Sequence, residues 1–271
     1  MTDYLKSHLP LCIIHLVLDY SKNAVIIFDD DKSYLFDGIK LQLFDFQPEK
    51  VLVSHLKSKV FKFLNKKWDN FDEVDGFRKA NQHFCDYAFT ATDSFLYFSG
   101  GRDSNYAHLK EVYKFSLKDN RAIRFPPMNT ARALHSLTLL NNKLYAIGGN
   151  DITTLHSTVE YFDGKQWIFC KSINHQRYMH KSIAHKGKIY VFGGQDRHNN
   201  NLSVERYDPE KDIWTIITYM PTFREDFQII SSDDSIYIIS KNNIDIYNTE
   251  LDKWTNFNHK EDFSSCHLTI L

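Results

Sequence analysis

The chain has 271 residues, with 33 basic and 34 acidic side chains, a formal net charge of −1, 42% hydrophobic residues and 15% aromatic residues. This length accommodates one large all-β domain or two ordinary domains, and the apolar content is sufficient for a core. A near-neutral charge provides no general attraction for nucleic acid or an anionic membrane, so neither is an expected partner.

The cysteines and the N-terminal segment indicate the compartment. Cys12, Cys85, Cys170 and Cys266 are far apart in the sequence and form no CxxC pair. Reduced thiols in an intracellular protein are favoured over a secreted protein with disulfides, which is the alternative. The apolar run 9–18 is too short to cross a bilayer and has no small-residue cleavage site, so we interpret it as a buried strand. A cytoplasmic protein is expected.

Short strands are predicted from the start of the chain. The first group lies at 11–18, 25–29 and 33–36, and a second group at 40–46, 50–55 and 60–68, where the apolar pattern of Val60–Trp68 matches that of Val159–Trp167. The charged stretch 69–82 is predicted to be a surface loop.

Three repeats follow in the middle of the chain. In each, an apolar strand ends in a glycine pair, and the first glycines are Gly100, Gly148 and Gly193, which are 48 and 45 residues apart. A fixed period of this size is typical of repeat architectures. The template has four strands: one after the R-x-x-H motif, one before the glycine pair, one in a V-E-x-Y/F-D element and one with a tryptophan.

The end of the chain contains a fourth such unit and an extra strand. The strands of that unit are predicted at 227–231, 236–240, 244–248 and around Trp254. Residues 267–271 resemble 135–140, which form the first strand of a repeat. Since the N-terminal unit lacks its own first strand, we expect 267–271 to complete it and so to close the array, which removes exposed sheet edges.

The glycine pairs, the element Val204–Asp208, Trp214 and the motif Met220-Pro-Thr-Phe-Arg224 together resemble the Kelch repeat. The resemblance is strong over 95–225, fair over 226–271 and weak over 1–94. It implies an all-β chain that forms a single closed β-propeller over 1–271, with about six four-stranded blades, the first completed by the C-terminal strand. The expected blades are 11–37 with 264–271, 39–71, 83–125, 132–170, 177–217 and 224–257.

The repeated glycines and tryptophans have structural roles in this interpretation. Glycine permits positive φ and close backbone approach at a crowded strand end. Trp68, Trp167, Trp214 and Trp254 each offer a large apolar area for burial between neighbouring sheets. The third unit has Ala122 at this place, and we expect Phe125 to fill the space.

The first candidate site is formed by arginines at one repeat position, Arg132, Arg177 and Arg224. Equivalent positions in successive blades are expected to form an arc at one end of the propeller, where guanidinium groups suit a carboxylate- or phosphate-bearing peptide. Arginines at this repeat position line the partner-binding face of Kelch substrate receptors. The alternative, that each arginine pairs with a neighbouring acid such as Asp226 and only stabilises its blade, remains open.

The second candidate site is formed by the loops that follow the glycine pairs. Arg102, Asn150 and Gln195 occupy equivalent places in three loops and are expected to help bind the partner. Solvated loop tips without such a role are the alternative.

No catalytic or metal-binding motif is found. His135, His180 and His267 share a repeat position and are expected to be structural, because a metal site needs three or four ligands that converge on one atom. The run Asp29–Asp31 lacks the spacing of a calcium loop and is interpreted as a solvated turn. No catalytic residue, metal or cofactor is therefore expected.

The resulting hypothesis is a non-enzymatic module that binds a protein or an acidic peptide. From the resemblance, the partners to consider are a ubiquitin-ligase component, with the chain as substrate receptor, and actin, with the chain as a scaffold. An enzyme similar to the Kelch-type sialic acid mutarotases or copper radical oxidases is the remaining alternative, although the sequence contains no residue spacing that points to such a site.

Overall fold

The structure is a computed structural model, and it describes the backbone of residues 12–16, 18–19, 24–29, 32–36, 41–43, 86–92, 94–103, 105–116, 121–197, 200–224, 227–232, 234–240, 243–258 and 266–270. The strands expected at 50–55 and 60–68, Trp68, the loop expected at 69–82, and Asp30 and Asp31 lie outside these residues.

The described residues form strands, turns and loops, and the prediction of an all-β chain is confirmed. No helix in this part of the chain has the length and apolar character needed to span a membrane. The chain divides into two compact units, one of Met1–Lys57 with Asp226–Leu271 and the other of Ser58–Glu225.

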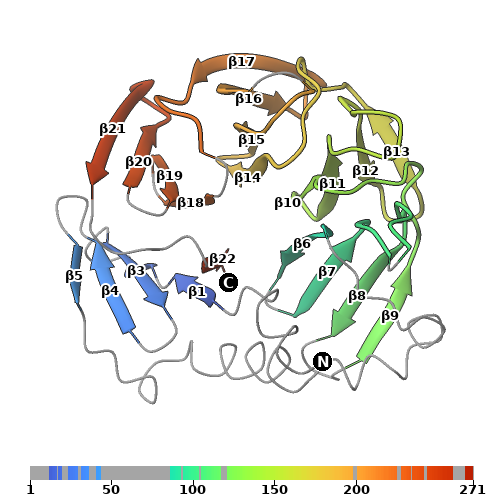
Figure 1. The fold of residues 1–271 in the computed structure, drawn as a ribbon, viewed down its shortest axis with the longest axis horizontal. Helices are drawn as coiled ribbons and strands as arrows, with labels where there is room; N and C mark the ends of the chain where they lie inside the picture. Colours follow the sequence, from blue (N-terminus) through green and yellow to red (C-terminus); the bar gives the residue numbers. More distant parts are fainter. Residues whose placement is uncertain are drawn as a thin grey trace. The chain divides into compact units, whose positions relative to one another are not determined.

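The second unit contains three four-stranded antiparallel sheets, each with its strands in chain order (Figure 1). We call these sheets blades and name each by its strands. Their strands are β6 (Ala88–Ala91), β7 (Phe95–Ser99), β8 (Val112–Ser116) and β9 (Arg121–Phe125); β10 (Ser136–Leu140), β11 (Lys143–Ile147), β12 (Val159–Phe162) and β13 (Trp167–Cys170); and β14 (Lys181–His185), β15 (Lys188–Phe192), β16 (Ser203–Asp208) and β17 (Ile213–Tyr219).

The first strands of neighbouring blades contact each other, since β10 lies against both β6 and β14 (Figure 1). Because the strands alternate in direction, the connections between second and third strands all emerge at one end of the blades. These connections, 100–111, 148–158 and 193–202, are the glycine-pair loops, and they form what we call the loop face. The tight turns, including 141–142 and 209–212, lie at the opposite end, the turn face.

The first unit contains two further four-stranded antiparallel sheets and one strand pair. One sheet has the order β18 (Gln228–Ser232), β19 (Ser235–Ser240), β20 (Asn243–Asn248) and β21 (Lys253–Asn258), and the other has the order β2 (Leu18–Asp19), β3 (Ala24–Asp29), β4 (Lys32–Phe36) and β5 (Leu41–Leu43). The remaining pair joins β1 (Cys12–Leu16) to β22 (Cys266–Ile270).

Within the residues that the structure describes, four blades are found, where the sequence predicted about six. The expected repeats at 83–125, 132–170, 177–217 and 224–257 each correspond to one complete four-stranded sheet, with β17 and β21 extending two residues and one residue beyond the expected ends. In the remaining four-stranded sheet, β5 (41–43) pairs with β4 as an outer strand. The sequence had placed these two strands in different blades, β4 in 11–37 and residues 41–43 at the start of 39–71. Residues 266–270 pair with the N-terminal segment as predicted, but in parallel, whereas neighbouring strands in the four blades are antiparallel.

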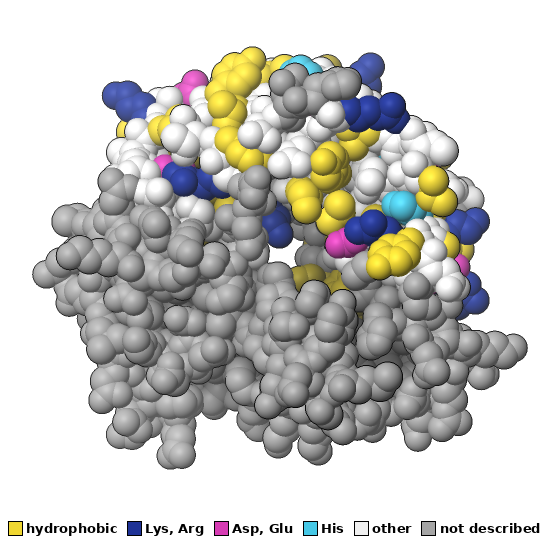
Figure 2. Space-filling view, in the orientation of Figure 1, with side chains coloured by type: hydrophobic (Ala, Val, Ile, Leu, Met, Phe, Trp, Pro, Cys, Tyr) yellow, Lys and Arg dark blue, Asp and Glu magenta, His cyan; other side chains and the backbone are white. Residues whose placement is uncertain are grey.

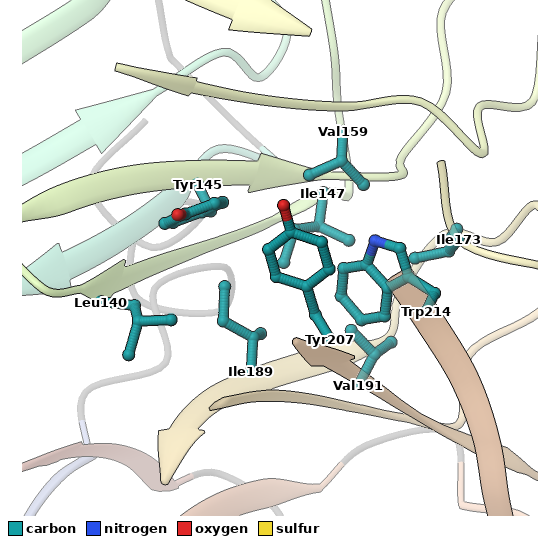
Figure 3. Packing of buried hydrophobic residues seen from close by; sticks show 9 residues of the cluster. All are labelled: Leu140, Tyr145, Ile147, Val159, Ile173, Ile189, Val191, Tyr207 and Trp214. Carbon is teal, nitrogen blue, oxygen red and sulfur yellow. The ribbon is translucent and has the colours of Figure 1, made fainter. Parts of the chain in front are cut away.

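Aromatic side chains fill the space between neighbouring blades, which is the role predicted for the tryptophans. Trp214 stacks on Tyr207 with ring centroids 4.9 Å apart, and Tyr207 lies between Trp214 and Tyr145 of the preceding blade (Figure 3). The indole N–H of Trp214 donates to the carbonyl oxygen of Lys171, at the end of the preceding blade, over 2.9 Å. Each tryptophan with this arrangement therefore joins two blades through both apolar contact and a hydrogen bond.

The blade that lacks this tryptophan uses Phe125, as expected. The centroid of the Phe125 ring lies 4.5 Å from that of Phe162 in the next blade and 5.7 Å from that of Tyr97 in its own blade. The boundary between these two blades is completed by the buried side chains of Val112, Met128 and Trp167.

Candidate functional site

The glycine pairs turn the chain sharply at the ends of β7, β11 and β15. Gly148 and Gly149 have φ angles of 60° and 85°, a region that favours glycine. A Cβ atom on Gly148 would lie 2.8 Å from the carbonyl oxygen of Arg177, in the next blade. The pair is therefore required both for the turn and for the close approach of neighbouring blades.

Arg132 and Arg177 are fully buried beneath the loop face, each with an exposed fraction of 0%. In the β14–β17 blade, Arg177 Nη1 donates to the carbonyl oxygens of Gly193 and Ser203 over 2.9 and 3.0 Å, and Nη2 donates to Glu205 Oε1 over 2.5 Å. Gly193 and Ser203 stand at the two stems of one glycine-pair loop. The guanidinium group thus holds both stems together.

The β10–β13 blade repeats this arrangement. Arg132 donates to the carbonyl oxygens of Gly148 and Thr158 over 2.7 and 2.9 Å and to Glu160 Oε1 over 3.1 Å. Burial lowers the pKa of the Arg132 guanidinium, and the Glu160 carboxylate opposes this effect. Glu160 is also fully buried, so the two charges compensate each other.

These placements correct the expectation that the three arginines present an arc of guanidinium groups to a partner. Arg132 and Arg177 have no exposed surface for a partner to contact, and the alternative, a structural ion pair in each blade, agrees with their geometry. Arg224 is half-buried. Its expected neighbour Asp226 lies outside the described residues.

The glutamates that pair with these arginines were not singled out from the sequence. Each follows its arginine by 28 residues, from the E position of the V-E element. The Glu205 carboxylate also accepts from the backbone N–H of Asn174 over 2.6 Å, which fastens the linker before the blade. The constant spacing of arginine and glutamate in two repeats is the feature of the sequence from which this pairing could have been predicted.

The three predicted loop residues occupy equivalent places on the loop face. Asn150 and Gln195 each form isolated β-bridges, with Ala133 and Tyr178 respectively, and Arg102 forms one with His108. The Gln195 side chain accepts from the Tyr178 hydroxyl over 2.9 Å. Arg102 forms an ion pair with Asp86. All three residues are half-buried, although the side-chain oxygen of Asn150 is itself buried, so they remain candidates for partner contact.

A row of left-handed residues runs across the loop face. Asp86, Leu134 and Met179 have φ angles of 58°, 53° and 57°. The N–H of Leu134 donates to the carbonyl oxygen of Asp86, and the N–H of Met179 donates to that of Leu134, both over 2.9 Å. Positive φ is unfavourable for such residues, so their repeated occurrence indicates that the contacts between blades stabilise this conformation.

Large apolar side chains are exposed on the same face. Tyr106, Ile152 and Met179 have exposed fractions of 70%, 78% and 44%. Figure 2 shows one face of the molecule, on which hydrophobic side chains of the described blades are gathered with basic, acidic and histidine side chains among them. The loops are joined to each other, since Arg197 Nη2 donates to the carbonyl oxygen of Thr153 over 2.6 Å.

The repeated histidines lie below the glycine pairs and connect neighbouring blades. His135 Nε2 is 2.8 Å from Ser99 Oγ, and His180 Nε2 is 2.8 Å from Ser136 Oγ. Burial lowers the pKa of His135 to about 3, so the ring is neutral, and it lowers the pKa of His180 as well. Within the described ranges, no group of three or more His, Cys, Asp or Glu side chains could hold a metal ion. His267 lies in β22, whose side chains are not described.

The four-stranded blades, the glycine pairs, the tryptophans between blades and the buried arginine–glutamate pairs define the class of β-propeller repeats. Residues 21–240 match the KLHDC2/KLHL20/DRC7 Kelch-repeats domain. The chain belongs to the Kelch-repeat family, which the sequence predicted from its repeated motifs.

Curated relatives match shorter stretches. The chain is 31% identical over 80 residues to Kelch repeat and BTB domain-containing protein 2 of Cowpox virus (strain GRI-90 / Grishak), covering 30% of this chain and 14% of the viral protein. The protein of the same name from Horsepox virus is 29% identical over 80 residues, covering 30% and 15%. Alpha-scruin of Limulus polyphemus is 31% identical over 119 residues, covering 41% and 12%. Most of the length of each relative is therefore not covered by the chain.

Proposed function

We propose that the chain is a non-enzymatic module that binds another protein through its loop face. The observation that carries this proposal is the exposure of Tyr106, Ile152 and Met179 on one face of three hydrogen-bonded blades. Solvated loop tips do not require large apolar side chains, whereas protein interfaces are enriched in tyrosine and methionine. A preformed surface also loses little conformational entropy when it binds.

The partner in this proposal is a protein with an acidic segment. Arg102 lies 5.9 Å from the centroid of the Tyr106 ring, and Arg197 donates to the carbonyl oxygen of Thr153, which follows Ile152. The side-chain N–H groups of Asn150 and Gln195 add donors on the same loops. The buried arginines contribute indirectly, by holding the loop stems. A ubiquitin-ligase component, with the chain as substrate receptor, and actin are the two kinds of partner that we carry forward from the family resemblance, with the protein acting in the cytoplasm.

We also propose that the pairing of β1 with β22 closes the array of blades. A closed array leaves no sheet edge at the junction of the chain ends and gives the loops a fixed base.

The experiment compares two double variants in pull-downs with candidate partners, including filamentous actin. Tyr106→Ser with Ile152→Ser removes anchors from the loop face, while Ile123→Ser with Ile213→Ser removes comparably exposed side chains from strands β9 and β17. We expect the first variant to lose partner binding by about tenfold or more and the second to retain it. Equal binding by both variants, with unchanged thermal stability, would contradict the proposal.

A further inference from the structure

A cavity of about 390 Å³ opens on the turn face, between the β10–β13 and β14–β17 blades. It is at the opposite end of the blades from the loop face, because its lining includes residues of the turns 141–142 and 209–212. The rings of Tyr145, Tyr161, Phe169 and Tyr207 contribute to its walls, and Lys143, Glu210 and Asp212 are among its polar lining residues.

The aromatic side of the cavity is preformed. The Tyr145 ring lies 5.5 Å from Tyr161 and 5.9 Å from Tyr207, centroid to centroid, and Figure 3 shows Tyr145 and Tyr207 side by side. The Tyr207 hydroxyl donates to Asp212 Oδ1 over 2.8 Å. The same oxygen accepts from the backbone N–H of Lys171 in the neighbouring blade over 2.9 Å, so the two sides of the cavity are tied together.

The charges around the cavity favour a cation. Glu210 and Asp212 are exposed, and neither forms an ion pair within the part of the chain that the structure describes. The cavity already receives one cation from the chain itself, because Lys143 Nζ lies 4.7 Å from the centroid of the Tyr161 ring. Ammonium and guanidinium groups are attracted to the faces of such rings.

We propose that this cavity binds an arginine side chain of a partner protein. A guanidinium group is planar, so it stacks on an aromatic ring while its N–H groups donate to a carboxylate. The ring of Phe169, which is 53% exposed, provides an open face on one blade, and Glu210 provides the carboxylate on the other. Lys143 then acts as a competitor within the chain for the Tyr161 ring. The protein would accordingly carry a second binding surface, opposite the loop face.

The probe is the peptide acetyl-Gly-Arg-Gly-amide, titrated into the full chain and followed by the amide NMR signals of Lys171 and Asp212. The control peptide carries citrulline, which has nearly the same shape and no charge. We expect the arginine peptide to bind with a Kd in the millimolar range and the citrulline peptide about fivefold or more weakly.

Three variants test the roles of the charged groups. Glu210→Gln is expected to weaken binding of the arginine peptide about threefold or more, and Lys143→Met to strengthen it about twofold, since the competitor is removed. Glu250→Gln changes the equivalent carboxylate in the turn before β21 and is expected to have no effect. Equal affinity for the two peptides, no binding of the arginine peptide, or unchanged affinity in Glu210→Gln would each overturn the proposal.

Discussion

At the residue scale, the buried arginine–glutamate pairs determine how the loops are held. Each pair places two opposite charges in a fully buried position and surrounds the guanidinium group with backbone carbonyl oxygens from both loop stems. Moving two charges out of water is costly, and the cost is recovered only when nearly every hydrogen bond is made. The pair is therefore weak evidence for added stability but strong evidence for a fixed geometry.

Removing one member of the pair is expected to be severe. Arg177→Ala leaves Glu205 charged and buried without its partner, and we expect it to lower the free energy of unfolding by about 3–5 kcal/mol in chemical denaturation. Arg206→Ala is the control, because Arg206 is next to Glu205 on β16 but is exposed. This variant should change the free energy of unfolding by less than about 0.5 kcal/mol. A cost for Arg177→Ala as small as that of the control would show that the pair does not fasten the loop.

The glycine pair allows a second prediction at this scale. Gly148→Ala should cost more than the roughly 1–2 kcal/mol expected for a left-handed alanine, because its Cβ would also lie 2.8 Å from the carbonyl oxygen of Arg177. Gly187→Ala is the matched control, with a φ of 73° and no atom within 4 Å of the added Cβ. Thermal denaturation should separate the two variants. Equal shifts would mean that close packing between blades is not what requires Gly148.

At the element scale, the first strands of the blades are joined by polar side chains. Beyond the two histidine–serine contacts, Ser182 Oγ donates to Ser136 Oγ over 2.6 Å, and Thr138 Oγ1 lies 2.5 Å from Ser182 Oγ, which connects β10 to β14. Ser136 and Thr138 are buried and Ser182 is half-buried, so removing one hydroxyl group would leave a largely desolvated partner without its hydrogen bond. The blades of the second unit are thus joined by aromatic packing towards their outer strands and by polar contacts at their inner strands.

This network makes stability depend on pH. A histidine in the unfolded chain has a pKa of about 6.5, whereas burial lowers the pKa of folded His135 to about 3. Between these values only the unfolded chain binds the proton, so the free energy of unfolding should decrease as the pH falls from about 6.5 towards 3, by up to about 1.4 kcal/mol per pH unit for one histidine. His180, with a pKa lowered by the same cause, acts in the same direction.

The measurement is urea denaturation of the wild type and of His135→Gln between pH 7 and pH 4. We expect the variant to be less stable at pH 7 and to lose less stability on acidification. His175→Gln, at an exposed position, serves as control. If the wild type and His135→Gln lose stability in parallel, protonation of His135 is not coupled to unfolding.

At the scale of the whole molecule, the two ends of the chain belong to one unit and their strands pair. The register sets Cys12 opposite Cys266 in the parallel pair of β1 and β22. Neighbouring strands are about 4.8 Å apart, a separation that a disulfide is able to bridge. This coincidence provides a direct test of the pairing on which the proposed closure depends.

We expect mild oxidation of a protein with Cys85→Ser and Cys170→Ser to join Cys12 to Cys266 within one chain. Mass spectrometry after proteolysis should find the linked peptides, and the yield should fall when the protein is unfolded in urea before oxidation. A folded protein that yields only unlinked or intermolecular products would contradict the pairing of β1 with β22.

Much of the repeat structure could be predicted from the sequence. Glycine pairs, V-E elements and tryptophans report local requirements, because positive φ, alternation in a strand and a large buried ring each depend on the residue itself. These signals located the four blades between 83 and 257 and the family. Where the glycine pair is missing, at 39–71, the same approach assigned residues 41–43 to the wrong sheet.

The sequence by itself also determined that arginines recur at one position and that three loops lie in equivalent places. Only the tertiary structure decided which of these side chains reach the surface. Burial depends on atoms contributed from distant parts of the chain, and for Arg132 those atoms belong to Gly148, Thr158 and Glu160. For the same reason, the exposed Tyr106 and Ile152 and the cavity between the β10–β13 and β14–β17 blades became visible only after the blades had been assembled.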